Sequence, residues 1–127
     1  MNRLVGLIMS DNAKNVTQTD WGYELYWAKK ENYASKILVF NKPGKTPFYF
    51  QLKTEKSWFI NEGKFLVRWI DKTGKIFQTE LEDGAVIECE TARPYSLECT
   101  SGKGSITESS NGYYEDDVYV VVGVENF

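Results

Sequence analysis

The feature that most constrains the fold is a series of short segments, rich in β-branched and aromatic residues, that follow one another along most of the chain. Turn-forming residues, above all glycine, asparagine and proline, separate them at intervals of about eight to twelve residues. This spacing is typical of strands in an antiparallel β-sandwich or closed barrel. We find no long apolar stripe of period 3.6, so little helix is expected. The expected strands are residues 23–28, 36–40, 48–53, 57–60, 65–70, 76–81, 85–89, 95–99, 105–108 and 118–124.

The chain has the size and composition of one globular domain. Its 127 residues are 42% hydrophobic and 26% charged, so we expect a single domain over residues 1–127. The 18 acidic and 15 basic residues give a formal net charge of −3. Because nucleic-acid-binding domains carry a basic face, this balance argues against a nucleic-acid partner.

Two apolar runs could suggest a membrane, but both are short. Residues 4–9 and 118–124 fall well below the roughly 20 residues that span a bilayer as a helix. The first run is also short for a signal peptide and has no small-residue cleavage site. We therefore expect a cytoplasmic protein with no membrane partner.

The sequence contains no histidine, which removes the commonest general base and the commonest ligand of zinc and iron. Catalytic sites that pair a serine or cysteine with histidine cannot be built from this chain alone. The two cysteines, Cys89 and Cys99, are too few for a metal cluster or a disulfide scaffold. We expect both thiols to be reduced.

Several motifs in order resemble small cupins related to the carboxy-terminal domain of bacterial mannose-6-phosphate isomerases. The resemblance implies an all-β, cupin-type double-stranded β-helix, or jelly-roll barrel, over residues 21–122, with residues 1–20 as an N-terminal strand or arm. The motifs are WGYELYWA at 21–28, KILVF with PGK at 36–45, FQLKTEKSWFINEG at 50–63, LEDGAVIEC with RPY at 81–95, and SITESS with DDVY at 105–119.

This chain departs from the metal-binding members of that family at the ligand positions. Where those cupins supply histidines and a glutamate, the matching positions here carry Gln51, Lys53, Lys56 and Tyr95, with Glu55 as an alternative for the glutamate. An ammonium group cannot coordinate a cation and repels it. We therefore expect no metal ion and no other cofactor.

The same segment supplies a candidate ligand site. Tyr49, Gln51 and Lys53 share one face of an extended strand, and the resemblance implies that this face looks into the barrel. The alternative is that Phe48, Phe50 and Leu52 face inward. Aromatic rings stack on sugars, and cationic groups bind phosphate. The full set of candidates is Tyr49, Gln51, Lys53, Glu55, Lys56, Trp58, Arg93 and Tyr95, of which Arg93 could add a phosphate contact.

Three functions compete on this basis. The first is a metal-free, non-catalytic cupin that binds a small carbohydrate or sugar phosphate in the barrel, or serves as a structural dimer. The second is a sugar-phosphate or nucleotide-sugar isomerase, whose base would have to come from Lys53, Lys56, Glu55, Tyr95 or Tyr49. The third is a protein–protein module, for example a homodimer that exchanges residues 4–9 between its subunits.

Overall fold

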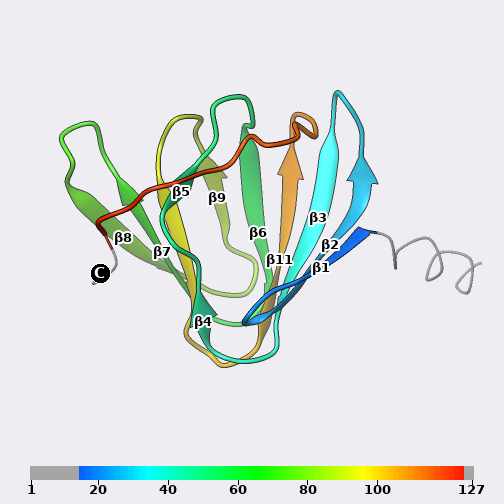
Figure 1. The fold of residues 1–127 in the computed structure, drawn as a ribbon. Coiled ribbons are helices and arrows are strands. Elements are labelled where there is room, and N and C mark those ends of the chain that lie inside the picture. The colour runs from blue at the N-terminus through cyan, green and yellow to red at the C-terminus, as the bar shows by residue number, and fades with distance from the viewer. Residues whose placement is uncertain (1–14, 125–127) are drawn as a thin grey trace, which may run out of the picture.

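Two antiparallel β-sheets face each other and enclose the interior of the molecule. The computed structural model describes residues 15–124, which form twelve strands and no α-helix. Figure 1 shows the strands of both sheets surrounding a common interior, with the C-terminal segment (red) running from the end of β11 toward β8. No helix in this part of the chain is long and apolar enough to cross a membrane.

The first sheet has the order β1-β2-β3-β11-β6-β9. Its strands are β1 (Val16–Gln18), β2 (Gly22–Lys29), β3 (Ala34–Phe40), β11 (Gly104–Ser110), β6 (Lys56–Glu62) and β9 (Val86–Cys89). The late strand β11 lies between two early ones, so this sheet interleaves distant parts of the chain. Residues that are far apart in the sequence therefore become neighbours on its inner face.

The second sheet has the order β12-β5-β10-β7-β8, and the short strand β4 also pairs with β10. Its strands are β12 (Tyr119–Val120), β5 (Tyr49–Phe50), β10 (Tyr95–Cys99), β7 (Phe65–Ile70), β8 (Ile76–Leu81) and β4 (Gly44–Lys45). Both sheets are antiparallel throughout, and the order mixes early and late strands as a jelly roll requires.

The core is built from residues that alternate along the strands. Trp21 stacks on Phe40 with ring centroids 3.9 Å apart, and Phe40 meets Phe65 edge to face. Gly104 allows this packing, since a Cβ atom there would lie 2.8 Å from the Phe65 ring. The most deeply buried apolar side chains are Phe40, Phe48, Trp58, Ile60, Phe65, Val67, Leu97 and Ile106.

The inner face of the first sheet changes from apolar to charged along its strands. Leu38, Ile106 and Ile60 are cross-strand partners and form an apolar row. Two residues further along the same strands, the partners are Lys36, Glu108 and Trp58. Because residues two apart lie on the same face, these charged side chains also point into the barrel. One end of the interior is therefore a closed apolar core, and the other carries charges.

The predicted strands agree with the observed ones except at the two segments that cross the barrel opening. Residues 48–53 were expected to form one strand, but only Tyr49–Phe50 pairs as β5. Of residues 118–124, only Tyr119–Val120 pairs, as β12. Strand β4 falls outside the predicted segments, and β1 lies within residues 1–20, which were expected to form an N-terminal strand or arm. Residues 4–9, predicted to be exchanged between subunits, lie outside the described residues.

Candidate functional site

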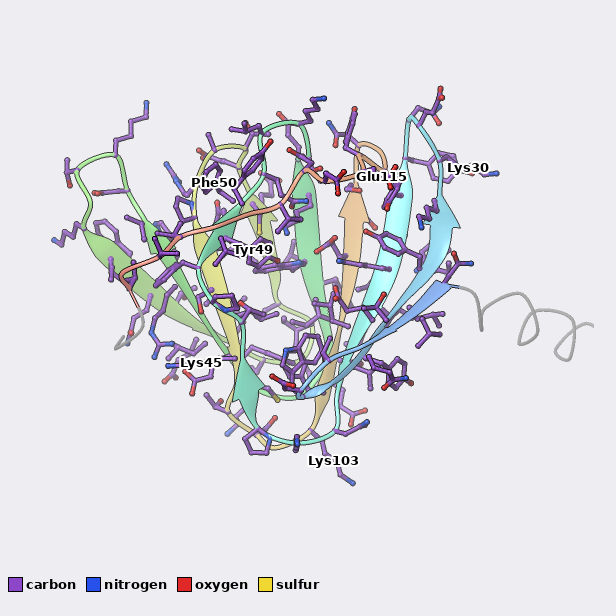
Figure 2. All side chains as sticks on the ribbon, in the orientation of Figure 1. Lys30, Lys45, Tyr49, Phe50, Lys103 and Glu115 are labelled. Atoms are coloured by element: carbon purple, nitrogen blue, oxygen red, sulfur yellow. The ribbon has the colours of Figure 1, made fainter. Side chains whose placement is uncertain are left out.

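A cavity of about 400 Å³ occupies the charged end of the barrel. The inner faces of β2, β3 and β11 form one wall, and residues 46–51 with the C-terminal segment 112–120 form the other. Tyr49 lies near the centre of the barrel in Figure 2, whereas Lys30 and Lys103 lie at its opposite ends. The cavity is thus the interior that the two sheets leave unfilled.

Glu108 is the centre of a buried polar network in this cavity. The carboxylate is only 5% exposed as a residue, and its Oε1 accepts a 2.8 Å hydrogen bond from Trp58 Nε1. The Lys56 ammonium lies 3.5 Å from the same oxygen, and the Lys36 ammonium lies 3.8 Å from Oε2. A single carboxylate thereby faces two buried cations.

The two lysines have further partners that fix them in place. Lys36 Nζ donates to Glu24 Oε1 at 2.6 Å, and Lys56 Nζ donates to the Tyr49 hydroxyl at 3.0 Å. Each ammonium also lies over aromatic rings, Lys56 at 4.6 Å from the centre of Tyr49 and Lys36 at 5.2 Å from that of Tyr26. Two cations and two carboxylates therefore balance, so the network carries no net charge.

The network keeps its members charged despite their burial. Burial alone would raise the pKa of Glu108, but Lys56, Lys36 and the hydrogen bonds from Trp58 and Lys56 hold it below its usual value. Burial would also lower the pKa values of Lys56 and Lys36, but Glu108 and the other partners raise both above the usual lysine value. Burial raises the pKa of the Tyr49 hydroxyl. At neutral pH these groups are therefore two ammonium ions, a carboxylate and a neutral phenol.

Cys89 lies beside this network but is not an activated nucleophile. Burial raises the pKa of its thiol to about 12, and the nearby Lys56 only partly offsets that effect. Since the thiolate is the reactive form, a thiol held protonated is inert. Both cysteines are free and buried in the structure.

Of the eight residues predicted to form the site, three line the cavity: Tyr49, Gln51 and Lys56. Two other predicted residues, Trp58 and Tyr95, are buried behind the cavity wall. The Trp58 ring packs edge-on against Tyr95, and the Tyr95 hydroxyl accepts a hydrogen bond from the Glu90 amide at 2.9 Å. Both rings support the cavity wall from behind.

The remaining three predicted residues do not line the cavity. Lys53 and Glu55 are exposed, and Arg93 forms an ion pair with Glu90 at 3.3 Å. The expectation that Tyr49, Gln51 and Lys53 share one inward face holds only for the first two. The alternative, with Phe48, Phe50 and Leu52 inward, fails as well, because Leu52 is exposed although Phe48 is buried.

The exposure of Lys53 and Leu52 is caused by a carboxylate from a distant part of the chain, which binds the backbone of residues 52–54. Asp117 accepts hydrogen bonds from the amides of Leu52, Lys53 and Thr54, and from the Thr54 hydroxyl at 2.8 Å. Three consecutive amides that turn toward one carboxylate cannot continue an extended strand. The chain therefore leaves β5 after Phe50, and Lys53 turns into solvent.

Four residues in and around this network were not among the predicted site residues: Glu24, Tyr26, Lys36 and Glu108. A signal was present, since Lys36 is in period with Leu38 and Phe40, and Glu108 is in period with Ile106. A charged residue on the otherwise apolar face of a strand is unusual, because charged side chains are almost never buried unless they are paired.

Gln51 leaves one polar atom unsatisfied. Its side-chain oxygen is buried and has no hydrogen-bond partner among the described residues. A buried acceptor in this state costs about 1–3 kcal/mol, and a water molecule or a ligand hydroxyl that reached it would remove that cost.

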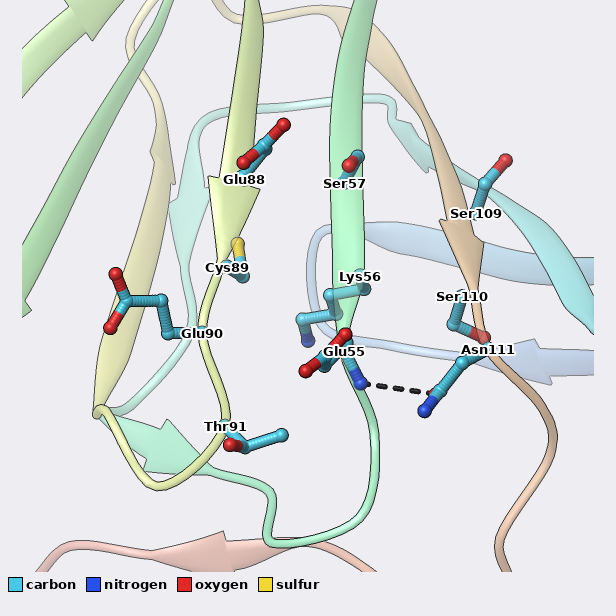
Figure 3. Close-up of a pocket in the computed structure, with 10 residues that line it drawn as sticks. All are labelled: Glu55, Lys56, Ser57, Glu88, Cys89, Glu90, Thr91, Ser109, Ser110 and Asn111. Atoms are coloured by element: carbon cyan, nitrogen blue, oxygen red, sulfur yellow. Dashed lines mark hydrogen bonds between the residues drawn. The ribbon is translucent and has the colours of Figure 1, made fainter.

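A second, wider hollow of about 690 Å³ lies where β6 begins and where β9 and β11 end. Figure 3 shows Glu55, Glu88 and Glu90 around it, with the hydrogen bond from the Glu55 amide to Asn111 Oδ1. All three glutamates are exposed residues. Within residues 15–124, no group of three or more histidine, cysteine, aspartate or glutamate side chains is placed to hold a metal ion. The barrel cavity, whose polar groups are fixed by one another, is therefore the stronger candidate site.

Stability should be nearly independent of pH between about pH 5.5 and 8, because no histidine titrates there. Glu108 and Asp117 have lowered pKa values, so their contribution is present above the unfolded carboxyl values and is lost as pH falls through the folded ones. Cys89 and the two lysines have raised pKa values, so their contribution is lost as pH rises, beginning with the thiol above about pH 8.5. Urea unfolding followed by tryptophan fluorescence at each pH measures this profile.

The matched variant is Cys89→Ala, which should move the start of the alkaline loss from about pH 8.5 toward the lysine range near pH 10. A change of more than about 1 kcal/mol in the free energy of unfolding between pH 6 and 8 would contradict the assignment, since it would require a group that titrates between those pH values.

Comparison with known proteins identifies the fold. No protein-family model matches the sequence, and no curated protein sequence does either. Among solved structures, the capsular polysaccharide assembling protein CapF from Staphylococcus aureus matches with a TM-score of 0.75 at 10% identity, over 84% of this chain and 32% of CapF. Oxalate decarboxylase from Bacillus subtilis matches with a TM-score of 0.75 at 14% identity, over 84% of this chain and 29% of that one.

Both neighbours are cupin-fold proteins, so the predicted all-β, cupin-type jelly-roll barrel is confirmed. This chain spans about a third of their length. At such low identity the likeness concerns the fold, and the function has to be argued from the side chains in the cavity.

Proposed function

We propose that this protein binds a small neutral carbohydrate, or a related polyol, in the barrel cavity without a metal ion and without catalysing a reaction. The observation that carries this proposal is the charge-balanced network of Glu24, Lys36, Lys56 and Glu108 along the inner wall. Such a wall offers fixed donors and acceptors to hydroxyl groups, while Tyr26, Tyr49 and Tyr113 offer ring surfaces for the apolar faces of a sugar.

A sugar phosphate is the less favoured ligand. Its dianionic group would have to be buried beside two carboxylates, and both ammonium groups already have carboxylate partners. Burying a charge without a partner is costly. The cations that might have helped lie elsewhere, since Lys53 is exposed and Arg93 is paired with Glu90.

The directions of the pKa shifts argue against the isomerase alternative. Isomerisation needs a base whose pKa lies near the working pH. The pKa values of Lys36, Lys56, Tyr26 and Tyr49 are raised and that of Glu108 is lowered, all away from neutrality. A metal-assisted route is also unfavourable, because the two carboxylates that could bind a cation are already paired with ammonium groups.

The direct test is a thermal-shift panel on metal-stripped protein with neutral hexoses and polyols, hexose phosphates, small carboxylates and divalent metal ions. CapF is described as assembling capsular polysaccharide, so the sugars of such polysaccharides are a reasonable first group of probes. A ligand at a hundred times its dissociation constant stabilises the folded state by about 2.7 kcal/mol, which should raise the Tm by several degrees. We expect that shift with a neutral sugar or polyol.

A matched pair of variants locates the binding site. Tyr113 lines the cavity, whereas Tyr33 is exposed and does not. Tyr113→Ala should weaken sugar binding about tenfold by removing a stacking surface worth about 1 kcal/mol, and Tyr33→Ala should leave it unchanged. A shift with hexose phosphates alone, with metal ions alone, or with none of the probes would overturn the proposal.

A further inference from the structure

The C-terminal edge of the second sheet exposes a continuous apolar segment. Val118 and Val120 are each 56% exposed, Tyr119 is 43% exposed and Val122 is 83% exposed. Contiguous exposed apolar residues of this kind usually mark an interaction surface. The segment extends beyond both ends of β12, the edge strand of the second sheet.

No strand within residues 15–124 pairs with the outer edge of this segment. On the inner side, β12 pairs with β5, with Tyr119 opposite Phe50, and the Val121 amide donates to the Phe48 carbonyl at 2.8 Å. Backbone groups alternate in direction along a strand, so those of Val118, Val120 and Val122 point to the outer edge. Among residues 15–124, β5 is the only strand that pairs with β12. This outer edge can therefore accept a strand.

The other edge strands carry the polar or charged residues that protect against such pairing. β8 contains Glu80, β9 contains Glu88, and β1 contains Thr17 and Gln18. Residues 118–122 contain no charge, no proline and no glycine. Natural proteins protect exposed edges with very short strands, charges, prolines or bulges. β12 itself pairs over two residues only, but the apolar segment 118–122 that continues it carries no charge and no proline, which favours a partner strand at this edge.

The sequence of this segment is nearly symmetric about Val120. In an antiparallel pair of two copies centred there, Val118 would face Val122 of the second copy, and Tyr119 would face Val121. The two Val120 residues would face each other and exchange both of their N–H···O=C bonds. Every opposed pair is then apolar, which is the self-complementarity that a two-fold interface requires.

We propose that a second copy of this chain pairs with the outer edge of residues 118–122 around a two-fold axis at Val120. The second sheets of the two barrels then join into one continuous sheet. This pairing uses the outward-facing backbone groups of the segment, whereas the side chains of Val118 and Val120 line the barrel cavity. Sedimentation is therefore measured without added sugar, so that sugar binding and dimer formation can fail separately.

The test is sedimentation equilibrium of the full chain, whose monomer mass is 14.6 kDa. The wild type should show a concentration-dependent dimer of twice that mass. Val120→Lys and Val120→Glu each place like charges directly opposite each other on the axis, so each alone should raise the dissociation constant at least about tenfold. An equimolar mixture of the two variants should dimerise again, because each lysine then faces a glutamate; this recovery would also show that both variants are folded.

The control is Val86→Lys, at an equally exposed valine on β9, which should leave the dissociation constant unchanged. A monomeric wild type would overturn the proposal. A Val120→Lys protein that dimerises like the wild type would also overturn it, and would direct attention to another interface, such as one formed by residues 4–9. Failure of the mixed variants to associate more tightly than either alone would rule out the two-fold axis at Val120.

Discussion

Replacing Glu108 by glutamine should lower the free energy of unfolding by about 3–5 kcal/mol, the usual cost of breaking a buried ion pair by removing one partner. The amide keeps the shape of the side chain and an oxygen that can accept from Trp58 Nε1. It loses the negative charge that faces Lys56 at 3.5 Å and Lys36 at 3.8 Å. Lys56 is 8% exposed, so water can do little to replace that charge. Urea unfolding and the Tm measure the loss, which we expect to exceed about 5 °C.

Two further variants separate this cause from a general effect of substitution in the barrel. Glu24→Gln removes a carboxylate that is 25% exposed and whose one ion-pair partner within residues 15–124 is Lys36, so it should cost only about 1 kcal/mol. Adding Lys56→Met to Glu108→Gln should recover part of the lost stability, because it removes the cation left unpaired. Equal losses in Glu108→Gln and Glu24→Gln, or no recovery in the double variant, would refute the central role of Glu108.

The residues of this network both stabilise the fold and form the wall of the candidate site. A cavity lined by unpaired charges would be unstable without its ligand, whereas Glu108 and Glu24 neutralise the two lysines when the cavity is empty. The polar wall is therefore formed before a ligand arrives, and preorganisation of this kind reduces the cost of binding.

The strands were largely predictable because their signals are local. β-Branched and aromatic residues between glycine-containing turns define segments such as Phe65–Ile70 and Ile76–Leu81 without reference to the rest of the chain. Lys56 and Trp58 were also identified in advance, since the family resemblance fixed their place on an inward-facing strand. Both are buried in the barrel.

The errors at the site have non-local causes. Lys53 was misplaced because Asp117, 64 positions later, bends the chain away from the barrel. Glu108 and Lys36 were missed because their pairing depends on β11 lying between β3 and β6, an order that the sequence does not reveal. The position of β12 at the edge of the second sheet, as residues 15–124 form it, is likewise a matter of strand order.

Asp117→Asn should destabilise the protein by about 3 kcal/mol, since several hydrogen bonds to a charged acceptor are lost together. Its carboxylate accepts from the amides of Leu52, Lys53 and Thr54 and from the Thr54 hydroxyl. These bonds hold the pKa of Asp117 below its usual value, although burial alone would raise it. An asparagine side chain would turn an NH₂ group toward donors, leaving buried donors without an acceptor. Urea unfolding at neutral pH measures the loss.

The neighbouring Asp116→Asn is the matched control. Asp116 is exposed and has a positive φ of 61°, a conformation that asparagine adopts readily, so this change should stay within about 0.5 kcal/mol. Because Asp117 ties the C-terminal segment to residues 52–54, and that segment forms one wall of the cavity, Asp117→Asn should also speed hydrogen exchange of the Thr54 amide and weaken sugar binding. If both variants were equally stable, or if exchange of that amide were unchanged, Asp117 would not be what closes the barrel.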